Sequence, residues 1–126
     1  MECKKVRNSS KQRLGRWGEE IARAYLEEQG CQYIDKNVRT PDGEIDIVMK
    51  QNEMLVFVEV KTRRNSNFSY PEEAVTDEKI EHMEDSATWY LQAHSESSTD
   101  WRIDVVAVIG SPGSLSPQIE WFQNAN

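Results

Sequence analysis

The stretch GEIDIVMKQNEMLVFVEVK, residues 43–61, predicts the centre of the fold. It contains two apolar runs of strand length, 44–49 and 54–60, which are rich in β-branched residues and are separated by the polar break 51–53. This is the pattern of a β-hairpin. Because the second run is apolar on both faces, we expect it to be a central strand that is covered on both sides.

Three charged residues, Asp46, Glu59 and Lys61, interrupt these apolar runs. Charges rarely lie in a buried strand unless they are paired or bind a metal ion. Side chains alternate along a strand, so Glu59 and Lys61 share a face. A two- or four-residue connection puts Asp46 opposite Glu59 on that face, whereas a three-residue connection puts it on the other face. We expect the even connection, because it gathers two carboxylates and one ammonium group.

The combination of Asp46, Glu59 and Lys61 suits the binding of a divalent metal ion and a phosphate. Two carboxylates that face each other repel, so the arrangement is poor for stability alone. Mg²⁺ and Mn²⁺ prefer oxygen ligands of this kind, and a nearby lysine can hold a water or stabilise charge on a phosphate. The pattern favours metal-assisted hydrolysis of a phosphodiester bond. The alternative is a solvated face with a surface ion pair, but Glu59 follows five apolar residues and Asp46 lies between two isoleucines.

At 126 residues the chain has the length of one domain and can bury a core without crosslinks. Its two cysteines, Cys3 and Cys31, make no disulfide framework, which favours a reducing, cytoplasmic setting. No apolar run approaches the roughly 18 residues of a membrane span, so we expect no membrane association. The basic N-terminus is not followed by an apolar segment and does not resemble a secretory signal.

Charge is distributed unevenly along the chain, whose formal net charge is −7. Residues 1–16 carry six basic side chains and one acidic one, whereas residues 65–126 carry two basic and eleven acidic ones. We expect residues 1–13 to be a disordered basic arm and residues 14–126 to be a single domain. Two interpretations stay open: Lys11, Arg13 and Arg16 contact the phosphates of a nucleic acid, or the segment is only a soluble tail.

Apolar periodicity predicts two helices and three strands besides the hairpin. The helices are expected over residues 14–29 and 77–94, and the strands over residues 31–38, 101–109 and 119–122. In the first strand we expect Cys31, Tyr33 and Ile34 to point inward. Asp104, within an otherwise apolar strand, is expected to be structural, with Arg102 as one partner.

Two acids of the first helix, Glu19 and Glu20, flank its apolar stripe on opposite sides. The helical wheel does not separate them, and either one can be an ordinary solvated acid. In the second helix Lys79 either reaches the charged cluster or pairs with an acid, and we favour the pairing. His82 and His94 have no partner at metal-ligand spacing and are expected to be exposed.

The segment 62–76 combines cations with aromatic rings, namely Arg63, Arg64, Phe68 and Tyr70. Such a combination suits contact with phosphates and stacking on bases. The alternative is a packed loop with its rings in the core and its arginines in water. Arg63 is the stronger candidate for nucleic-acid binding, because a continued strand places it on the face of Glu59.

Several motifs resemble those of the YraN family of uncharacterised proteins. That family looks related to archaeal Holliday-junction resolvases within the restriction-endonuclease-like superfamily of D…E-x-K nucleases. The resemblance covers roughly residues 14–123. Its motifs are GRWGEEIARAYL (15–26), NVR (37–39), GEIDIV (43–48), FVEVKTR (57–63) and RIDVVAV (102–108).

The resemblance implies a fold and a site. The fold is an α/β structure with a mixed central β-sheet flanked by α-helices, and the site binds Mg²⁺. In the family pattern Asp46 and Glu59 are metal ligands and Lys61 is the catalytic lysine. A glutamate of the first helix also belongs to the site, four residues after a glycine and three before an alanine. Glu19 fits this position, and Glu20 does not.

Three hypotheses follow. The first is a divalent-metal-dependent endonuclease that cuts DNA, by family analogy branched DNA, with the Val60 carbonyl as an inferred extra ligand. The second is a non-catalytic nucleic-acid-binding or scaffolding module with a nuclease-like fold, which the acidic net charge suits. The third is a structural cluster in which Glu59–Lys61 and Asp46–Arg63 pairs stabilise the sheet. Since resolvase-like relatives often act as dimers, a homodimer is a candidate assembly.

Overall fold

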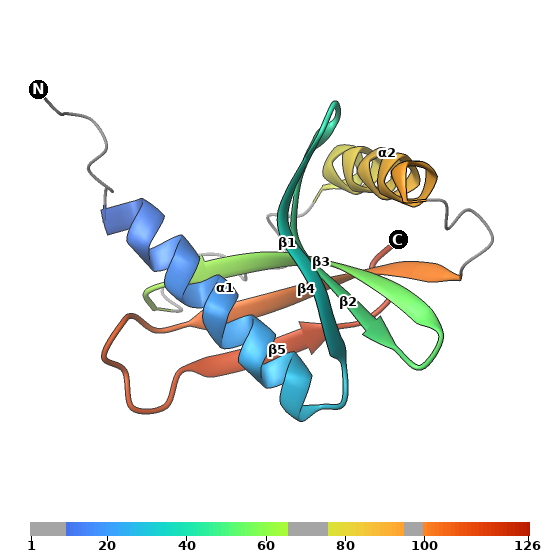
Figure 1. Ribbon diagram of the computed structural model, residues 1–126. Helices are drawn as coiled ribbons and strands as arrows, with labels where there is room; N and C mark the ends of the chain where they lie inside the picture. The colour runs from blue at the N-terminus through green and yellow to red at the C-terminus, as the bar shows by residue number, and fades with distance from the viewer. Residues whose placement is uncertain (1–9, 66–75, 95–99) are drawn as a thin grey trace, which may run out of the picture.

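A computed structural model describes residues 10–65, 76–94 and 100–126. Its five strands form one mixed sheet, with a helix on each side (Figure 1). The predicted α/β class is therefore confirmed. In chain order the elements are α1 (Ser10–Glu28), β1 (Gln32–Thr40), β2 (Gly43–Gln51), β3 (Met54–Arg63), α2 (Asp77–Ala93), β4 (Trp101–Ile109) and β5 (Gln118–Phe122).

The order of strands in the sheet follows the chain, from β1 to β5. Neighbouring strands are antiparallel except β3 and β4, which are parallel and have α2 between them in the chain. In the hairpin Gln51 pairs with Met54, so the predicted even connection is confirmed, and it is a two-residue turn over Asn52 and Glu53. Asn52 has a φ of 56°, a left-handed conformation that asparagine tolerates and that tight hairpin turns require.

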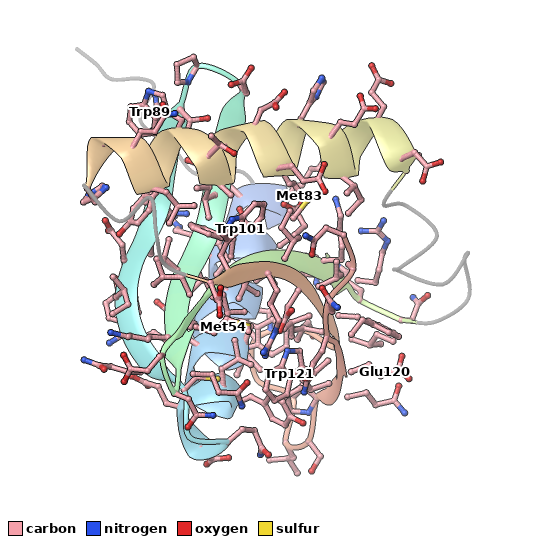
Figure 2. All side chains as sticks on the ribbon, turned by 90° about the vertical axis from the view of Figure 1, so that its right-hand side faces the viewer. Met54, Met83, Trp89, Trp101, Glu120 and Trp121 are labelled. Atoms are coloured by element: carbon pink, nitrogen blue, oxygen red, sulfur yellow. The ribbon has the colours of Figure 1, made fainter. Side chains whose placement is uncertain are left out.

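The central strand β3 is covered on both faces, as its apolar composition predicts. On the α1 side Val56 packs with Leu26 in one buried cluster. On the α2 side Phe57 belongs to a second cluster, where its ring makes edge-to-face contacts with Tyr90 and Trp101. Trp101 lies between α2 and the sheet in Figure 2. Two separate cores thus fix the two helices against β3.

The outer half of the β1–β2 hairpin bends out of the sheet (Figure 1). Side chains of a regular strand alternate, yet Ile45 and Ile47 belong to clusters on opposite sides of the sheet. The change of face comes at Asp46. Across from it in the ladder between β1 and β2 lies Asn37, whose φ of 49° is left-handed. The bend therefore puts Asp46 where the hairpin leaves the sheet.

Helix α1 lies very close to β3 at Gly18, which is buried. A Cβ atom at Gly18 would collide with the side chain of Thr62 in β3. Only glycine permits such a close approach of two backbones. Because Glu19 follows Gly18, the same contact brings Glu19 toward the end of the hairpin that carries Asp46.

The first helix begins at Ser10, earlier than the predicted start at residue 14. Lysine, glutamine and arginine are good helix formers, so a basic segment can continue a helix toward the N-terminus. Lys11 and Arg13 are therefore helical, and the prediction of a disordered arm is wrong for residues 10–13. The remainder of the predicted arm, residues 1–9, lies outside the described residues, as do Phe68 and Tyr70.

The first strand extends to Thr40, beyond its predicted end. The prediction that Ile34 points inward is wrong, because its side chain is 38% exposed. The pairing with β2 shifts between Tyr33 and Asp35, and this irregularity turns Ile34 outward. Cys31 is buried, and Tyr33 packs against the core on the α1 side, as predicted.

The buried acid Asp104 is structural, as expected. Its carboxylate accepts hydrogen bonds from Arg102 Nε at 3.0 Å, from Trp121 Nε1 at 2.8 Å and from the Asn124 N–H at 2.9 Å. These bonds join β4, β5 and the residues after β5, and Figure 2 shows Trp121 on the side of the sheet away from α2. Within the described residues, neither helix has the length and apolarity needed to cross a membrane.

Candidate active site

Glu59 of β3 is at the centre of a charged cluster. Its Oε2 atom lies 3.2 Å from Lys61 Nζ and 3.8 Å from Lys79 Nζ. Lys61 is two residues further along β3, whereas Lys79 comes from the first turn of α2. The side chains of Glu59 and Lys61 are only 12% and 14% exposed. Lys79 pairs with an acid, as favoured, and because that acid is Glu59 it also reaches the charged cluster, which was the other alternative.

Asp46 lies across the hairpin and interacts with Glu59. The ladder between β2 and β3 ends at Ile47 and Val58, one pair before Asp46 and Glu59. Instead, Asp46 Oδ2 accepts a hydrogen bond from the Val60 N–H at 2.9 Å. Burial raises the pKa of Asp46 to about 8; repulsion from Glu59 adds to the rise, and the bond from Val60 opposes it. The two carboxylates act on each other as expected, although they are not a regular ladder pair.

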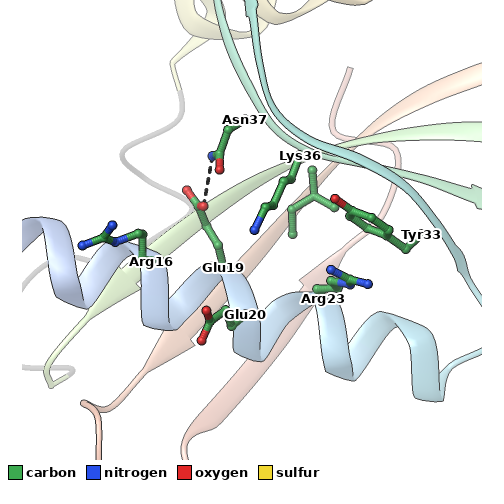
Figure 3. Close-up of a pocket in the computed structure, with 8 residues that line it drawn as sticks. Arg16, Glu19, Glu20, Arg23, Tyr33, Lys36 and Asn37 are labelled. Carbon is green, nitrogen blue, oxygen red and sulfur yellow. Dashed lines mark hydrogen bonds between the residues drawn. The ribbon is translucent and has the colours of Figure 1, made fainter.

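Glu19 of α1 is the third acid of the cluster. Its Oε1 atom accepts a hydrogen bond from Asn37 Nδ2 at 3.1 Å, drawn as a dashed line in Figure 3. Burial raises the pKa of Glu19, and the nearby carboxylate of Glu59 raises it further, while the bond from Asn37 lowers it. Glu19 also raises the pKa of Asp46, whereas Glu20 is exposed to solvent. The structure therefore brings Glu19 into the cluster, as the family pattern implied.

Sequence reasoning missed Glu44. It is exposed, but its charge raises the pKa of both Asp46 and Glu19. Together with Glu59 and Met83 it lines a small hollow between the hairpin and α2. The bend at Asp46 puts Glu44 there, and a regular strand pattern gives no sign of such a bend. The one indication in the sequence was that Glu44 lies two residues before Asp46 in the GEID motif.

The donor set suits a hard divalent cation. Asp46 and Glu59 supply carboxylate oxygens, and the main chain of Val60 lies against Asp46. Mg²⁺ usually binds one or two carboxylates and keeps several waters. The repulsion that raises the pKa of Asp46 is a strain that a cation would relieve. Among the described residues, no three Asp, Glu, His or Cys side chains are arranged to hold a metal ion. The carboxylates that the structure brings together are therefore the pair Asp46 and Glu59, with Glu19 close enough to interact with both.

A basic groove lies between the start of α1 and the end of β3, and three of the predicted nucleic-acid contacts meet in it. The described residues that line it include no acid; they are Ser10, Lys11, Leu14, Thr62, Arg63, Arg64 and Asn65. Lys61 directly precedes Thr62 in β3, so the groove follows the charged cluster along this strand. Arg63 donates to the Thr62 carbonyl at 3.1 Å, and no Asp46–Arg63 pair is found among the described contacts. The structural hypothesis therefore loses one of its two pairs.

A second pocket lies between α1 and β1 (Figure 3). Arg16, predicted with the groove residues, lines this pocket instead, and Arg13 lines neither pocket, although it is exposed on α1. The Arg23 guanidinium stacks over the Tyr33 ring, 3.5 Å from its centroid. The pocket contains both cations and carboxylates, which makes it less suited to phosphate than the basic groove. Its lining residues are Arg16, Glu19, Glu20, Arg23, Tyr33, Lys36, Asn37 and Ile47.

Comparison with known proteins places similar sequences in one family. The profile of the uncharacterised protein family UPF0102 matches residues 18–108. A UPF0102 protein of Syntrophotalea carbinolica is 50% identical over 95 residues, which cover 75% of this chain and 77% of the relative. One from Beutenbergia cavernae is 43% identical over 100 residues, covering 79% and 85%. One from Vibrio parahaemolyticus is 38% identical over 117 residues, covering 92% and 93%.

Among solved structures, SfsA of Pyrococcus furiosus, determined in complex with Ca²⁺, matches with a TM-score of 0.36 at 16% sequence identity. The match covers 87% of this chain and 62% of that protein, which is less than two thirds of its length. A likeness at this level carries no argument about function.

Proposed function

This chain belongs to the uncharacterised protein family UPF0102, and we propose that it is a divalent-metal-dependent endonuclease that hydrolyses phosphodiester bonds in DNA. The YraN resemblance indicated by the sequence motifs is to this same family. A family of uncharacterised proteins supplies no activity, so the proposal depends on the residues of the site.

The observation that carries the proposal is the meeting of Asp46 with Glu59 and Lys61 at one point of the hairpin. The main-chain N–H of Val60 holds the carboxylate of Asp46, and the pKa of that carboxylate responds to Glu59. Lys61 Nζ lies 3.2 Å from Glu59. Carboxylates that repel each other in a largely buried position, beside a lysine, suit a metal ion and the phosphate that it binds.

Each charged residue of the cluster has a separate role in the proposed hydrolysis. Asp46 and Glu59, with the Val60 carbonyl, would hold Mg²⁺ or Mn²⁺. When bound, this cation polarises the phosphate and lowers the pKa of a bound water. The ammonium group of Lys61 stabilises the negative charge that develops on the phosphate. Glu19, which accepts a hydrogen bond from Asn37 at 3.1 Å, would bind the cation directly or position a water.

The basic groove supports DNA as the substrate. Lys11, Arg63 and Arg64 line it, and it begins where β3 leaves the charged cluster. Cations in such a groove attract the phosphate backbone, so a strand lying there would bring a neighbouring phosphate to Lys61. Branched DNA is the form that the resemblance to Holliday-junction resolvases suggests, and it is part of the proposal.

A cleavage assay tests the proposal. The wild-type chain is incubated with labelled four-way junction, duplex and single-stranded DNA in Mg²⁺, Mn²⁺ or EDTA. We expect cleavage of at least one substrate with either metal ion and none in EDTA. Asp46→Asn should abolish cleavage, whereas Lys50→Ala should not, because Lys50 lies beside Glu53 at the other end of the hairpin, 4.0 Å from it. Metal-independent cleavage, or full activity in Asp46→Asn, would overturn the proposal.

One observation favours the second hypothesis, a nucleic-acid-binding module without turnover. Two lysines already contact Glu59, so that carboxylate is compensated without a metal ion. A binding module predicts that DNA binds equally well in EDTA and in Mg²⁺, and that Asp46→Asn leaves this binding unchanged. The nuclease proposal predicts that divalent ions strengthen binding through Asp46.

A further inference from the structure

Two lysines from different elements contact the same oxygen atom of Glu59. Lys61 Nζ is 3.2 Å and Lys79 Nζ is 3.8 Å from Glu59 Oε2. The family pattern gives Lys79 no place in the site, and from the sequence an ordinary pairing with an acid is favoured over a role in the cluster. One carboxylate needs only one ammonium group for compensation, so the second cation is available for another partner.

The position of Lys79 is set by the rigid start of α2. Thr76 caps the helix, and its Oγ1 accepts a hydrogen bond from the Lys79 N–H at 3.2 Å. The next residues on the same side, Ile80 and Met83, pack against the core cluster that contains Phe57. The backbone of Lys79 is therefore fixed beside β3, while its long side chain can still move.

The two lysines differ in exposure. The side chain of Lys79 is 42% exposed, whereas that of Lys61 is 14% exposed. If Glu59 shared its carboxylate with a cation, its attraction for the two lysines would weaken. The more distant and more exposed Lys79 is the lysine that would then be free to turn outward, toward a phosphate at the mouth of the site.

We propose that Lys79 binds a non-bridging phosphate oxygen of the nucleic-acid substrate from the α2 side of the site. This inference rests on the proposed nuclease function and deepens it. The basic groove contacts the backbone from the start of α1, so the substrate lies across the end of β3 with cations on both sides.

The composition of α2 localises this contact. Lys79 is the only lysine or arginine of the helix, whose other charged residues include Asp77, Glu78, Glu81, Glu84 and Asp85. These acids repel a phosphate backbone, so the substrate can approach α2 only at Lys79. Lys79, at the edge of an acidic helix, thus restricts the orientation of the bound nucleic acid and also increases its affinity.

The test compares Lys79→Ala and Lys79→Arg with the matched control Lys50→Ala. Binding of a labelled four-way junction and of a duplex is measured by fluorescence anisotropy in Ca²⁺ over a series of salt concentrations. Single-turnover cleavage is measured in Mg²⁺, Mn²⁺ affinity by calorimetry, and folding by thermal denaturation.

We expect Lys79→Ala to weaken DNA binding about tenfold or more, as the loss of a hydrogen bond to a charged group does. The slope of log K against log salt should become shallower by about 0.9 for one lost phosphate contact. Mn²⁺ affinity should be unchanged or higher, because the substitution removes the ammonium group of Lys79, which competes with the metal ion for Glu59. Lys79→Arg should recover most of the binding, and Lys50→Ala should match the wild-type chain.

The inference is overturned if Lys79→Ala binds and cuts DNA like Lys50→Ala while the wild-type chain shows metal-dependent cleavage; the nuclease function then stands. If the wild-type chain does not cut DNA but Lys79→Ala loses binding and salt dependence, the contact stands and the nuclease function fails. A wild-type chain that neither binds nor cuts these probes overturns both.

Discussion

The carboxylate of Asp46 accepts a hydrogen bond from the backbone N–H of Val60 at 2.9 Å, at the point where the regular ladder of the hairpin stops. Strand β3 thus holds Asp46 through its main chain and presents Glu59 and Lys61 through its side chains. The bond favours the charged carboxylate, but burial and the charge of Glu59 outweigh it and raise the pKa to about 8. Asp46 is held in a position that disfavours its charge, and a bound cation would remove this cost.

In the absence of divalent ions, we expect stability to fall as the pH rises from the ordinary carboxyl value of 3.8 to about 8. Between these values the folded state binds a proton on Asp46 that the unfolded state has lost, so a higher pH favours unfolding. Below 3.8 both states are protonated and the effect is absent; above about 8 it is complete. Each pKa unit of difference costs about 1.4 kcal/mol.

Thermal denaturation in EDTA at a series of pH values measures this slope. Asp46→Asn keeps an oxygen that can accept the Val60 bond but cannot ionise, so it should remove most of the slope. The pKa of Glu19 is also raised, and this residue supplies a remainder of the same sign. Equal slopes in the wild-type chain and in Asp46→Asn would show that Asp46 is not the group responsible.

Lys61→Ala should reduce cleavage strongly and lower the stability of the fold only moderately. We expect cleavage to slow by about 100-fold or more, as happens when one group that stabilises transition-state charge is removed. The loss of stability should stay well below the roughly 3–5 kcal/mol of a stranded buried charge, because Lys79 remains 3.8 Å from Glu59.

The double variant of Lys61→Ala with Lys79→Ala is the companion measurement. It leaves Glu59 without either of these lysines. The decrease in its unfolding midpoint should exceed the sum of the decreases in the two single variants. The structural hypothesis predicts the reverse pattern for Lys61→Ala alone, with normal cleavage and a large loss of stability.

Gly18→Ala should disturb the site from a distance. The added methyl group would collide with Thr62, so α1 must move from β3, at an expected cost of about 1–3 kcal/mol. Since Glu19 follows Gly18, cleavage should fall as well. Combining Gly18→Ala with Thr62→Ala should restore part of both.

Gly15→Ala is the matched control in the same helix. No atom lies within 4 Å of a Cβ built at Gly15. This change should stabilise the chain by up to about 1 kcal/mol, the difference in helix propensity between alanine and glycine, and leave cleavage intact. If Gly18→Ala behaved like Gly15→Ala, the close packing at Thr62 would not be what positions Glu19.

Lys11→Ala and Arg64→Ala should each weaken DNA binding without changing metal affinity. Both residues line the basic groove and are exposed, so each substitution removes a phosphate contact and leaves the fold intact. The slope of log K against log salt should become shallower by about 0.9 for each contact to duplex DNA. Salt slopes equal to that of Lys50→Ala would exclude the groove as the path of the substrate.

The sequence predicted the central part of the fold because alternation and turn chemistry are local. Two apolar runs around a short polar break indicate a hairpin, and an even connection was expected because it gathers the charged residues on one face. Gln51 pairs with Met54 as that register requires. The bend at Asp46 could not be predicted in this way, because it coincides with a left-handed residue, Asn37, in the neighbouring strand, and alternation along a strand gives no sign of it. Without the bend, neither Glu44 nor the bond from Val60 to Asp46 could be foreseen.

The choice between Glu19 and Glu20 of α1 could not be made from periodicity. Glu19 and Glu20 flank the same apolar stripe, and periodicity cannot say which side meets a neighbouring strand. The family motif favoured Glu19, and Asn37 binds it in the structure. Lys79 was expected to pair with an acid, and it does, but only the packing of α2 against β3 shows that this acid is Glu59.

Calorimetric titration of Mn²⁺ into the wild-type chain and into Asp46→Asn tests the central claim most directly. A metal site built on Asp46 and Glu59 predicts saturable binding to the wild-type chain and little or none to Asp46→Asn, with both proteins folded. No binding to the wild-type chain, or equal binding to the two proteins, would contradict the claim that these carboxylates form a metal centre.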